Sequence, residues 1–500
     1  MSRAACAGAL VALLCATILA PRPAAAQSYR LRLDARAQTV AFRGITADSI
    51  LATETIPGPN GGPVTPDGLS VSCGPFPYCY FFRPGPLERT APLTTGAAVT
   101  VWGFGVPGLR VHADARLAGD LGGDAEWPGL DPALQLLEGF AEYANERITA
   151  RLGRQTVIGR LGFAGFDGGR ITGRLPRHGL EAEGYLGWGL ARAIALPVTS
   201  PALNPLDQFQ PRDRQIIAGL AAGWRAPVAD LRAEYRREID PGSDYFVSER
   251  MSVSGTLRPL LRWTAAAGIE YDMAFGQTGT ADASLRYNGD AIGGLVGYRR
   301  YRPHFDLWTI WGAFSPAAYD DVHAMAWAQP LTSLRLTVRG ERFWYEPTDA
   351  GTPLVRVEDA GWRVRGSASW RPAPRWQLDG GYLAEFGPGA ASRSADAGVT
   401  WTPTDRLSVS GFGALLARPL EFRFSETNVT SLGLDVNWDA RESLRLGAGL
   451  AHYWEERERP DASGIDWTQT RLHLRATMLF ESGADRDRLP PARRRRGAGE

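Results

Sequence analysis

The sequence predicts an all-β fold: a transmembrane antiparallel β-barrel with about 22 strands, in a range of about 18 to 22. Three observations lead to this prediction. One segment after another alternates between apolar and polar residues, and tight turns alternate with longer connections. In addition, no segment after residue 26 contains the roughly 20 consecutive apolar residues of a membrane helix.

The N-terminal residues have the pattern of a secretory signal peptide. Arg3 precedes an apolar run over 4–20, and Ala24–Ala26 forms the small-residue exit of such a segment. We expect cleavage after this exit, so that residues 1–26 are removed and the chain is exported. An uncleaved anchor is the alternative, but the apolar run is short for a membrane span and ends at Pro21.

A long segment, residues 44–96, interrupts the regular pattern after a first predicted strand over 29–42. It is rich in Pro and Gly and contains Cys73 and Cys79, which we expect to form a disulfide bond in an exported chain. A segment of this length is usually a functional loop or an insert. Two hypotheses follow: the segment folds inward and constricts or plugs a pore, which its many aromatic residues favour, or it forms a disulfide-bonded knob outside.

The last predicted strand, residues 466–480, shows most clearly how the two faces differ. Leu472 and Leu474 fall on one face, whereas Arg471 and Arg475 fall on the other. One face therefore suits lipid and the other suits a polar interior. A half-buried strand of a soluble protein would show the same alternation. Its repetition along the chain favours the membrane barrel, and a soluble propeller is disfavoured because no blade signature recurs.

The order of the connections points to the same architecture. Tight turns rich in Pro, Asn, Gly and Asp recur through the second half, for example at 288–290, 371–374 and 402–405, with looser connections such as 303–318 between them. Short turns on the periplasmic side and longer loops outside are the rule for bacterial barrels. Over residues 29–480, the chain thus resembles outer-membrane β-barrels of the porin type from Gram-negative bacteria.

The resemblance implies a single barrel domain over 27–480 in the outer membrane, in contact with its lipid. In such barrels the last strand commonly ends in an aromatic residue that the barrel-assembly machinery reads, and Phe480 matches that position. The chain departs from this pattern because residues 481–500 follow. We expect them to form a disordered, Arg-rich tail.

No catalytic or metal-binding pattern is present in the sequence. None of the six histidines has a second His at metal-ligand spacing, and neither a nucleophile elbow nor a zinc-protease motif occurs. The glycine-rich run 165–169 lacks the Lys of a phosphate-binding loop and is interpreted as a turn that leads into a strand. We therefore predict no enzyme activity, cofactor, metal or nucleic-acid partner.

If the apolar faces contact lipid, the opposite faces line a lumen in which both charges occur and Arg is the more frequent. The candidate pore-lining residues are Arg32, Arg116, Arg151, Arg174, Glu183, Arg236, Glu270, Arg339, Arg365 and Arg475. Such a wall predicts a channel for passive or weakly selective diffusion of small polar, possibly anionic, solutes. Taken singly, each residue is better interpreted as part of an ion pair that braces the wall. The alternative function is a non-conducting or plugged barrel that serves as a scaffold, adhesion or export component.

Overall fold

A computed structural model describes residues 28–58, 62–75, 77–122, 134–190, 215–239, 241, 246–302, 318–346, 360–387, 392–421, 425–458 and 467–482. The predicted signal peptide and the chain after residue 482 lie outside these ranges. Within the described part of the chain, no helix is long and apolar enough to cross a membrane.

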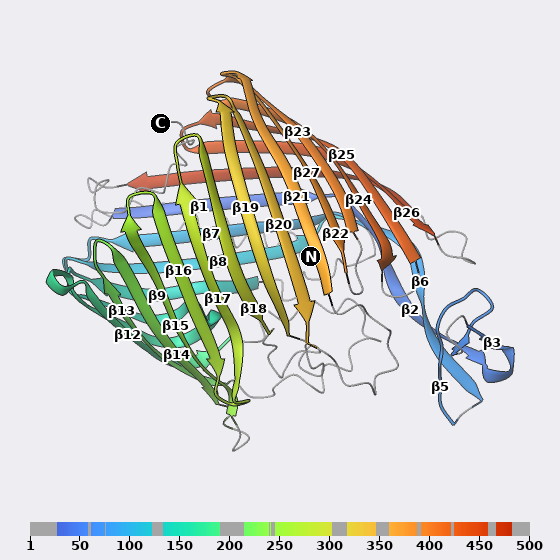
Figure 1. Ribbon diagram of the computed structural model, residues 1–500, viewed down its shortest axis with the longest axis horizontal. Coiled ribbons are helices and arrows are strands. Elements are labelled where there is room, and N and C mark those ends of the chain that lie inside the picture. Colours follow the sequence, from blue (N-terminus) through green and yellow to red (C-terminus); the bar gives the residue numbers. More distant parts are fainter. Residues whose placement is uncertain are drawn as a thin grey trace, which may run out of the picture.

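Twenty-two strands form one closed antiparallel sheet, because β1 pairs with both β7 and β27 (Figure 1). This confirms the predicted fold class and strand number. The barrel strands are β1 (Ser28–Gln38), β7 (Pro92–Trp102), β8 (Leu109–Asp120), β9 (Leu134–Ala144), β10 (Ile148–Gly159), β11 (Gly162–Leu175), β12 (Leu180–Gly189), β13 (Ile216–Arg225), β14 (Ala229–Ile239), β15 (Phe246–Leu260), β16 (Trp263–Asp272), β17 (Gln277–Asn288), β18 (Ile292–Tyr301), β19 (Tyr319–Leu331), β20 (Leu334–Tyr345), β21 (Ala360–Ala373), β22 (Trp376–Phe386), β23 (Ser392–Thr404), β24 (Leu407–Glu421), β25 (Ser425–Arg441), β26 (Leu444–Glu458) and β27 (Trp467–Ser482).

Most of the tight turns lie at one end of the barrel, where β1 begins and β27 ends, whereas the two-residue turn between β10 and β11 lies at the other end. One of these turns contains the 3₁₀ helix η2 (Pro176–His178) between β11 and β12. The seam extends slightly beyond the predicted end of the barrel at residue 480, because β27 continues to Ser482. Glu481 pairs with Arg30 of β1 at 2.6 Å, so residues 481 and 482 belong to the barrel and not to the tail.

The two faces of the sheet differ as the alternation predicts. On the outer face, aliphatic side chains such as Leu152, Leu186 and Leu220 are 60–71% exposed. Many residues on the opposite face are charged, and Glu142 and Asp321 are buried there. An apolar outer belt around a charged interior is the arrangement that a closed barrel needs in a lipid bilayer. We call the inner face of the wall the lumenal face.

The segment predicted to be irregular over 44–96 is largely regular instead. β2 (Val40–Leu51) continues β1, and β6 (Tyr78–Thr90) continues into β7. The ladder keeps its register across the junction, since Ala37 faces Leu93 and Val40 faces Thr90. Sequence reasoning missed this hairpin because Pro and Gly in β6 weaken its strand signal.

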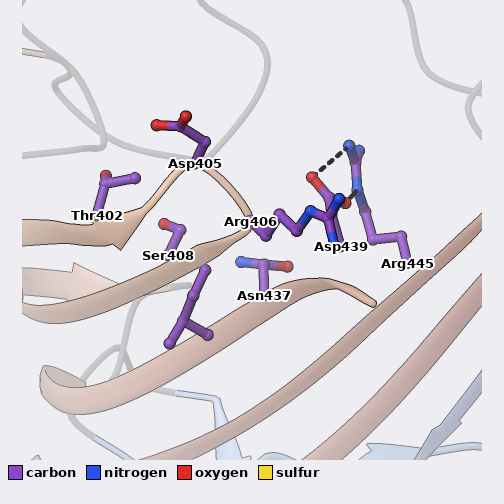
Figure 2. A pocket seen from close by; sticks show the side chains of 8 residues that line it. Thr402, Asp405, Arg406, Ser408, Asn437, Asp439 and Arg445 are labelled. Carbon is purple, nitrogen blue, oxygen red and sulfur yellow. Dashed lines mark hydrogen bonds and ion pairs between the residues drawn. The ribbon is translucent and has the colours of Figure 1, made fainter. Parts of the chain in front are cut away.

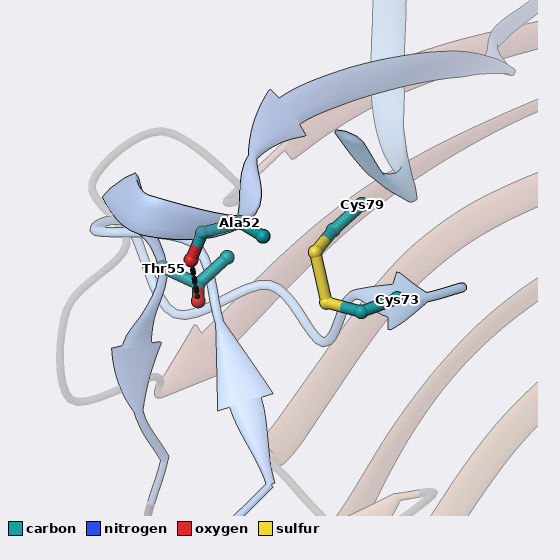
Figure 3. The surroundings of a disulfide bond; sticks show 4 residues. All are labelled: Ala52, Thr55, Cys73 and Cys79. Carbon is teal, nitrogen blue, oxygen red and sulfur yellow. Dashed lines mark hydrogen bonds between the residues drawn. A yellow bond between two sulfur atoms is a disulfide. The ribbon is translucent and has the colours of Figure 1, made fainter. Parts of the chain in front are cut away.

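We call residues 40–90 the hairpin extension. Its outer part contains the 3₁₀ helix η1 (Ala52–Glu54) and the short strands β3 (Ile56–Pro57), β4 (Pro63–Val64) and β5 (Ser72–Cys73). Cys73 and Cys79 form the predicted disulfide bond between β5 and β6, close to the turn in which Thr55 Oγ1 donates a hydrogen bond to the Ala52 carbonyl oxygen (Figure 3).

The hairpin extension projects beyond the barrel strands at the lower right of Figure 1. At its base β2 lies against β27, where the Ala41 N–H donates to Gln469 Oε1 and the Thr39 N–H donates to the Leu472 carbonyl oxygen. Tyr78 and Tyr80 are 48% and 60% exposed. This position favours the external-knob hypothesis over the hypothesis that the segment constricts the pore.

Replacing both cysteines by serine is expected to loosen only the outer part of the hairpin extension. Just two residue pairs join β5 to β6, and two more join β3 to β4, so the cross-link supplies much of the local order. Limited proteolysis should cut residues 52–77 faster in the double variant, while the heat-modifiable gel mobility of the barrel stays unchanged. Equal cleavage rates in the variant and in the oxidised protein would contradict this expectation.

Candidate functional site

Ion pairs cover the lumenal face of the barrel. A representative group lies on β8 to β10, where Glu142 accepts hydrogen bonds from Arg110, at 2.6 Å, and from Arg151. Another crosses β20 to β22, where Arg363 lies 2.8 Å from Glu341 and 2.7 Å from Glu385. Cross-strand pairs of this kind brace neighbouring strands while they keep the interior polar.

The predicted pore-lining residues lie on ten different strands and do not form one compact site. Nine of them have an ion-pair partner among the described residues, and Arg116 has a buried Nε without a hydrogen-bond partner there. The pairs are Arg32–Asp34, Arg151–Glu142, Arg174–Glu181, Glu183–Arg170, Arg236–Glu238, Glu270–Arg250, Arg339–Glu341, Arg365–Asp396 and Arg475–Asp435. The bracing interpretation of the individual residues is therefore consistent with this geometry.

A hairpin at the end of β10 and β11 leaves the barrel wall. β10 pairs with β9 only as far as Arg154, and β11 pairs with β12 only from Phe166 onward. The two strands nevertheless continue to pair with each other up to Gly159 and Gly162. Within the described part of the chain, residues 155–165 thus form a hairpin tip without a ladder partner in β9 or β12, and we call it the ledge.

Glycines stand where the ledge bends away from the wall. Gly153 has φ = 128° and faces Gly168 across the hairpin. A Cβ atom at Gly153 would lie 2.2 Å from the carbonyl oxygen of Gly139, and one at Gly168 would lie 2.1 Å from that of Leu186. Only glycine permits so close a backbone approach. The glycine-rich run 165–169 was predicted to be a turn, and that prediction is wrong because the run lies within β11 and includes part of this bend.

The ledge bends inward and lies on the lumenal face. Val157 and Ala164 of the ledge, together with the adjoining Phe166, pack with Ile217 of β13 and with Tyr185 of β12. Phe166 is fully buried, and its ring stacks on that of Tyr185 with 5.2 Å between centroids. Ile217 and Tyr185 alternate with the exposed, outward-facing Leu220 and Leu186, so they point into the lumen. A small apolar core therefore holds the ledge inside the barrel.

Polar contacts attach the tip of the ledge farther around the wall. Glu234 Oε2, on β14, accepts a hydrogen bond from the Arg160 backbone N–H at 2.8 Å. The guanidinium of Arg236 donates to the carbonyl oxygen of Leu161 at 2.6 Å and to that of Phe163 at 3.3 Å. The Arg160 side chain reaches β17, where it forms an ion pair with Asp282. The ledge consequently extends over the lumenal face from β11 to β17.

The other face of the ledge points away from the wall, toward the open lumen. Ile158 and Phe163 are cross-strand neighbours on this face and are 77% and 48% exposed. Thr156 lies on the same face and donates to Glu138 at 2.7 Å. Arg154 and Asp167 pair at its base. Sequence reasoning missed the ledge, although its wall-facing positions change from the charged Arg151 to the uncharged Gln155 and Val157 after Gly153, a signal that could have revealed it.

A shallow pocket lies at the tight-turn end, between the β23–β24 and β25–β26 turns (Figure 2). Thr402, Ser408 and Asn437 line it, and Asp439 and Arg445 form an ion pair at one side with an Nε–Oδ1 distance of 2.5 Å. Asp439 and Arg445 thus satisfy each other at an open rim. The pocket therefore adds to the polar mouth of the barrel without forming a separate site.

The described residues contain no group of three or more His, Cys, Asp or Glu side chains that could hold a metal ion.

Comparison with known proteins gives structural likeness only. No family model and no curated protein sequence matches the chain. Solved structures that are similar include the copper transporter OprC, with 11% identity and a TM-score of 0.46, over 92% of this chain and 81% of that one. OpdK of Pseudomonas aeruginosa, in a structure with vanillate, has 10% identity and a TM-score of 0.37 over 90% and 99%. OccAB2 of Acinetobacter baumannii has 9% identity and a TM-score of 0.40 over 91% and 98%.

In architecture, the chain is an outer-membrane β-barrel. The closed sheet of 22 strands and its apolar outer belt decide this point. The identities and TM-scores of the neighbours carry no conclusion about the solute.

Proposed function

We propose that this outer-membrane barrel is a channel for passive diffusion of small polar solutes, with a weak preference for anions. The observation that carries the proposal is a closed barrel whose lumenal face is lined by ion pairs on all sides. Such a wall replaces part of the hydration of a polar solute and supports a water-filled path.

The anion preference follows from unequal exposure within the pairs. The side chain of Arg339 is 50% exposed, whereas that of its partner Glu341 is 2% exposed. Arg475 is likewise 47% exposed above Asp435, which is 22% exposed. At these positions the guanidinium groups meet the water, and the carboxylates lie beneath them. The lumen therefore presents more positive than negative potential to a passing ion.

Planar-bilayer recordings with the refolded protein test this function. We expect steady openings, and under a salt gradient a reversal potential of the sign that shows anion preference. Changing Arg339 and Arg475 together to Gln should lower the anion-to-cation permeability ratio, because two exposed positive charges are lost. Arg258→Gln, at the exposed turn-end rim, is a matched control that should change the ratio less. A folded protein that never conducts would contradict the proposal.

The second candidate function is a non-conducting scaffold or adhesion barrel, which the projecting hairpin extension with its exposed Tyr78 and Tyr80 favours. In either case, we propose that the outer belt contacts membrane lipid and that Phe480, 42% exposed on that face, serves as the signal for the barrel-assembly machinery. Neither proposal includes catalysis.

A further inference from the structure

We propose that the ledge is the solute-selecting element of the channel, and that it selects by apolar contact rather than by charge. Ile158 and Phe163 would bind the flat apolar part of a small solute as it passes. This inference rests on the proposed channel function and adds a solute class to it: small solutes, of any charge, that combine an apolar group with a polar one.

The ledge lies between the lumenal wall and the open lumen. Its tip contacts Glu234 and Asp282, on strands three and six places beyond β11 around the barrel. The ledge therefore covers lumenal wall that would otherwise be open. A solute that moves along this side of the barrel must pass the free face of the ledge.

The free face of the ledge offers apolar surface and little unpaired charge. Arg154 forms two hydrogen bonds with Asp167, at 2.7 and 2.9 Å, and the Arg160 side chain is paired with Asp282. Glu234 accepts hydrogen bonds from the ledge backbone and from Arg232. Because these charges are paired within the wall, a solute at the free face of the ledge contacts mainly the side chains of Ile158 and Phe163.

The apolar core that holds the ledge does not include Ile158 or Phe163. The side chains that hold the ledge are on its other face, where Phe166 is fully buried and Val157 and Ala164 are 8% and 6% exposed. Ile158, by contrast, is 77% exposed. Ile158 and Phe163 are cross-strand neighbours, and apolar side chains that stay exposed side by side are a feature of binding surfaces. A solute that covers them removes apolar area from water and becomes locally enriched.

The test compares uptake of two zwitterions of similar size into liposomes that contain the full-length mature protein: L-phenylalanine, with an apolar ring, and L-glutamine, with a polar amide. The measured quantity is the ratio of the phenylalanine uptake rate to the glutamine uptake rate. We expect this ratio to be about three-fold higher for the wild-type protein than for the double variant Ile158→Ser, Phe163→Ser. The control Phe412→Ser removes another exposed aromatic side chain, on the lumenal face of β24 opposite Gly433. It should leave the ratio unchanged.

The outcomes separate the two proposals. A conducting ledge variant with an unchanged ratio would overturn the selecting role, and an equal fall in the Phe412→Ser control would overturn its assignment to the ledge. Absence of solute uptake by folded wild-type protein would instead overturn the channel function itself. As a second readout, millimolar phenylalanine should increase the current noise of single wild-type channels, and this noise should be lost in the double variant.

Discussion

Single-channel conductance is expected to rise by about two-fold or more when the tip of the ledge is removed. The change deletes residues 156–165 and joins Gln155 to Phe166 through a short glycine turn. Those two residues face each other in the hairpin, so the join preserves their pairing. Conductance grows with the open cross-section, and the deletion uncovers the lumenal face that the ledge now occupies. Planar-bilayer recordings of the deletion variant and wild type measure the difference.

A milder change tests whether the ledge is held by its contacts. Asp282→Asn weakens the ion pair with Arg160 and should produce brief openings to the higher level of the deletion variant. The matched control is Asp290→Asn, which weakens a comparable ion pair with Arg262 in a turn at the rim. It should leave the openings as in wild type. If the deletion variant conducts no better than wild type, the ledge does not limit the current.

Loss of the Asp321 carboxylate is expected to cause a large loss of stability. Its side chain is fully buried, and it lies 2.7 Å from both Arg299 Nε and His323 Nδ1. Asp321→Ala would leave the partly buried Arg299 without this partner, and removing one member of a buried pair is costly. Because about a third of the Arg299 side chain is exposed, we expect the free energy of unfolding to fall by about 2–3 kcal/mol.

Reversible urea titration in detergent micelles measures this effect. The control is Asp439→Ala, which removes the partner of Arg445 at the exposed rim and should lower the free energy of unfolding by no more than about 1 kcal/mol. Equal losses in the two variants would show that burial does not determine the contribution of these pairs.

Local patterns in the sequence predict the wall of this barrel well. The alternation of Leu472 and Leu474 with Arg471 and Arg475 needs only the two-residue period of a strand, and the turn residues mark where strands end. These rules depend on near neighbours, and for that reason the strand number and the two faces follow from the sequence. The same rules place Arg339 and Arg475 on the lumenal face, where the structure has them.

The ledge and the hairpin extension depend on contacts between distant residues. Alternation continues through Val157 and Phe166, and it does not reveal that the sheet bends and lays this face on Ile217. The contact between Arg160 and Asp282 joins strands that are far apart in the sequence. In the hairpin extension, β6 contains Pro and Gly and so has only a weak local preference for the strand conformation. Its pairing with β2 keeps it extended.

The unbroken register between the hairpin extension and the barrel has a mechanical consequence. β1 closes the seam with β27, and the same strand runs on, with one hydrogen-bonded residue between, into the projecting β2. A force applied to the outer part of the hairpin extension would therefore be transmitted directly to β1, because no flexible linker separates the two. Tension in that direction acts along the strand and would have to shear many hydrogen bonds at once, so the seam resists opening when the hairpin extension is pulled.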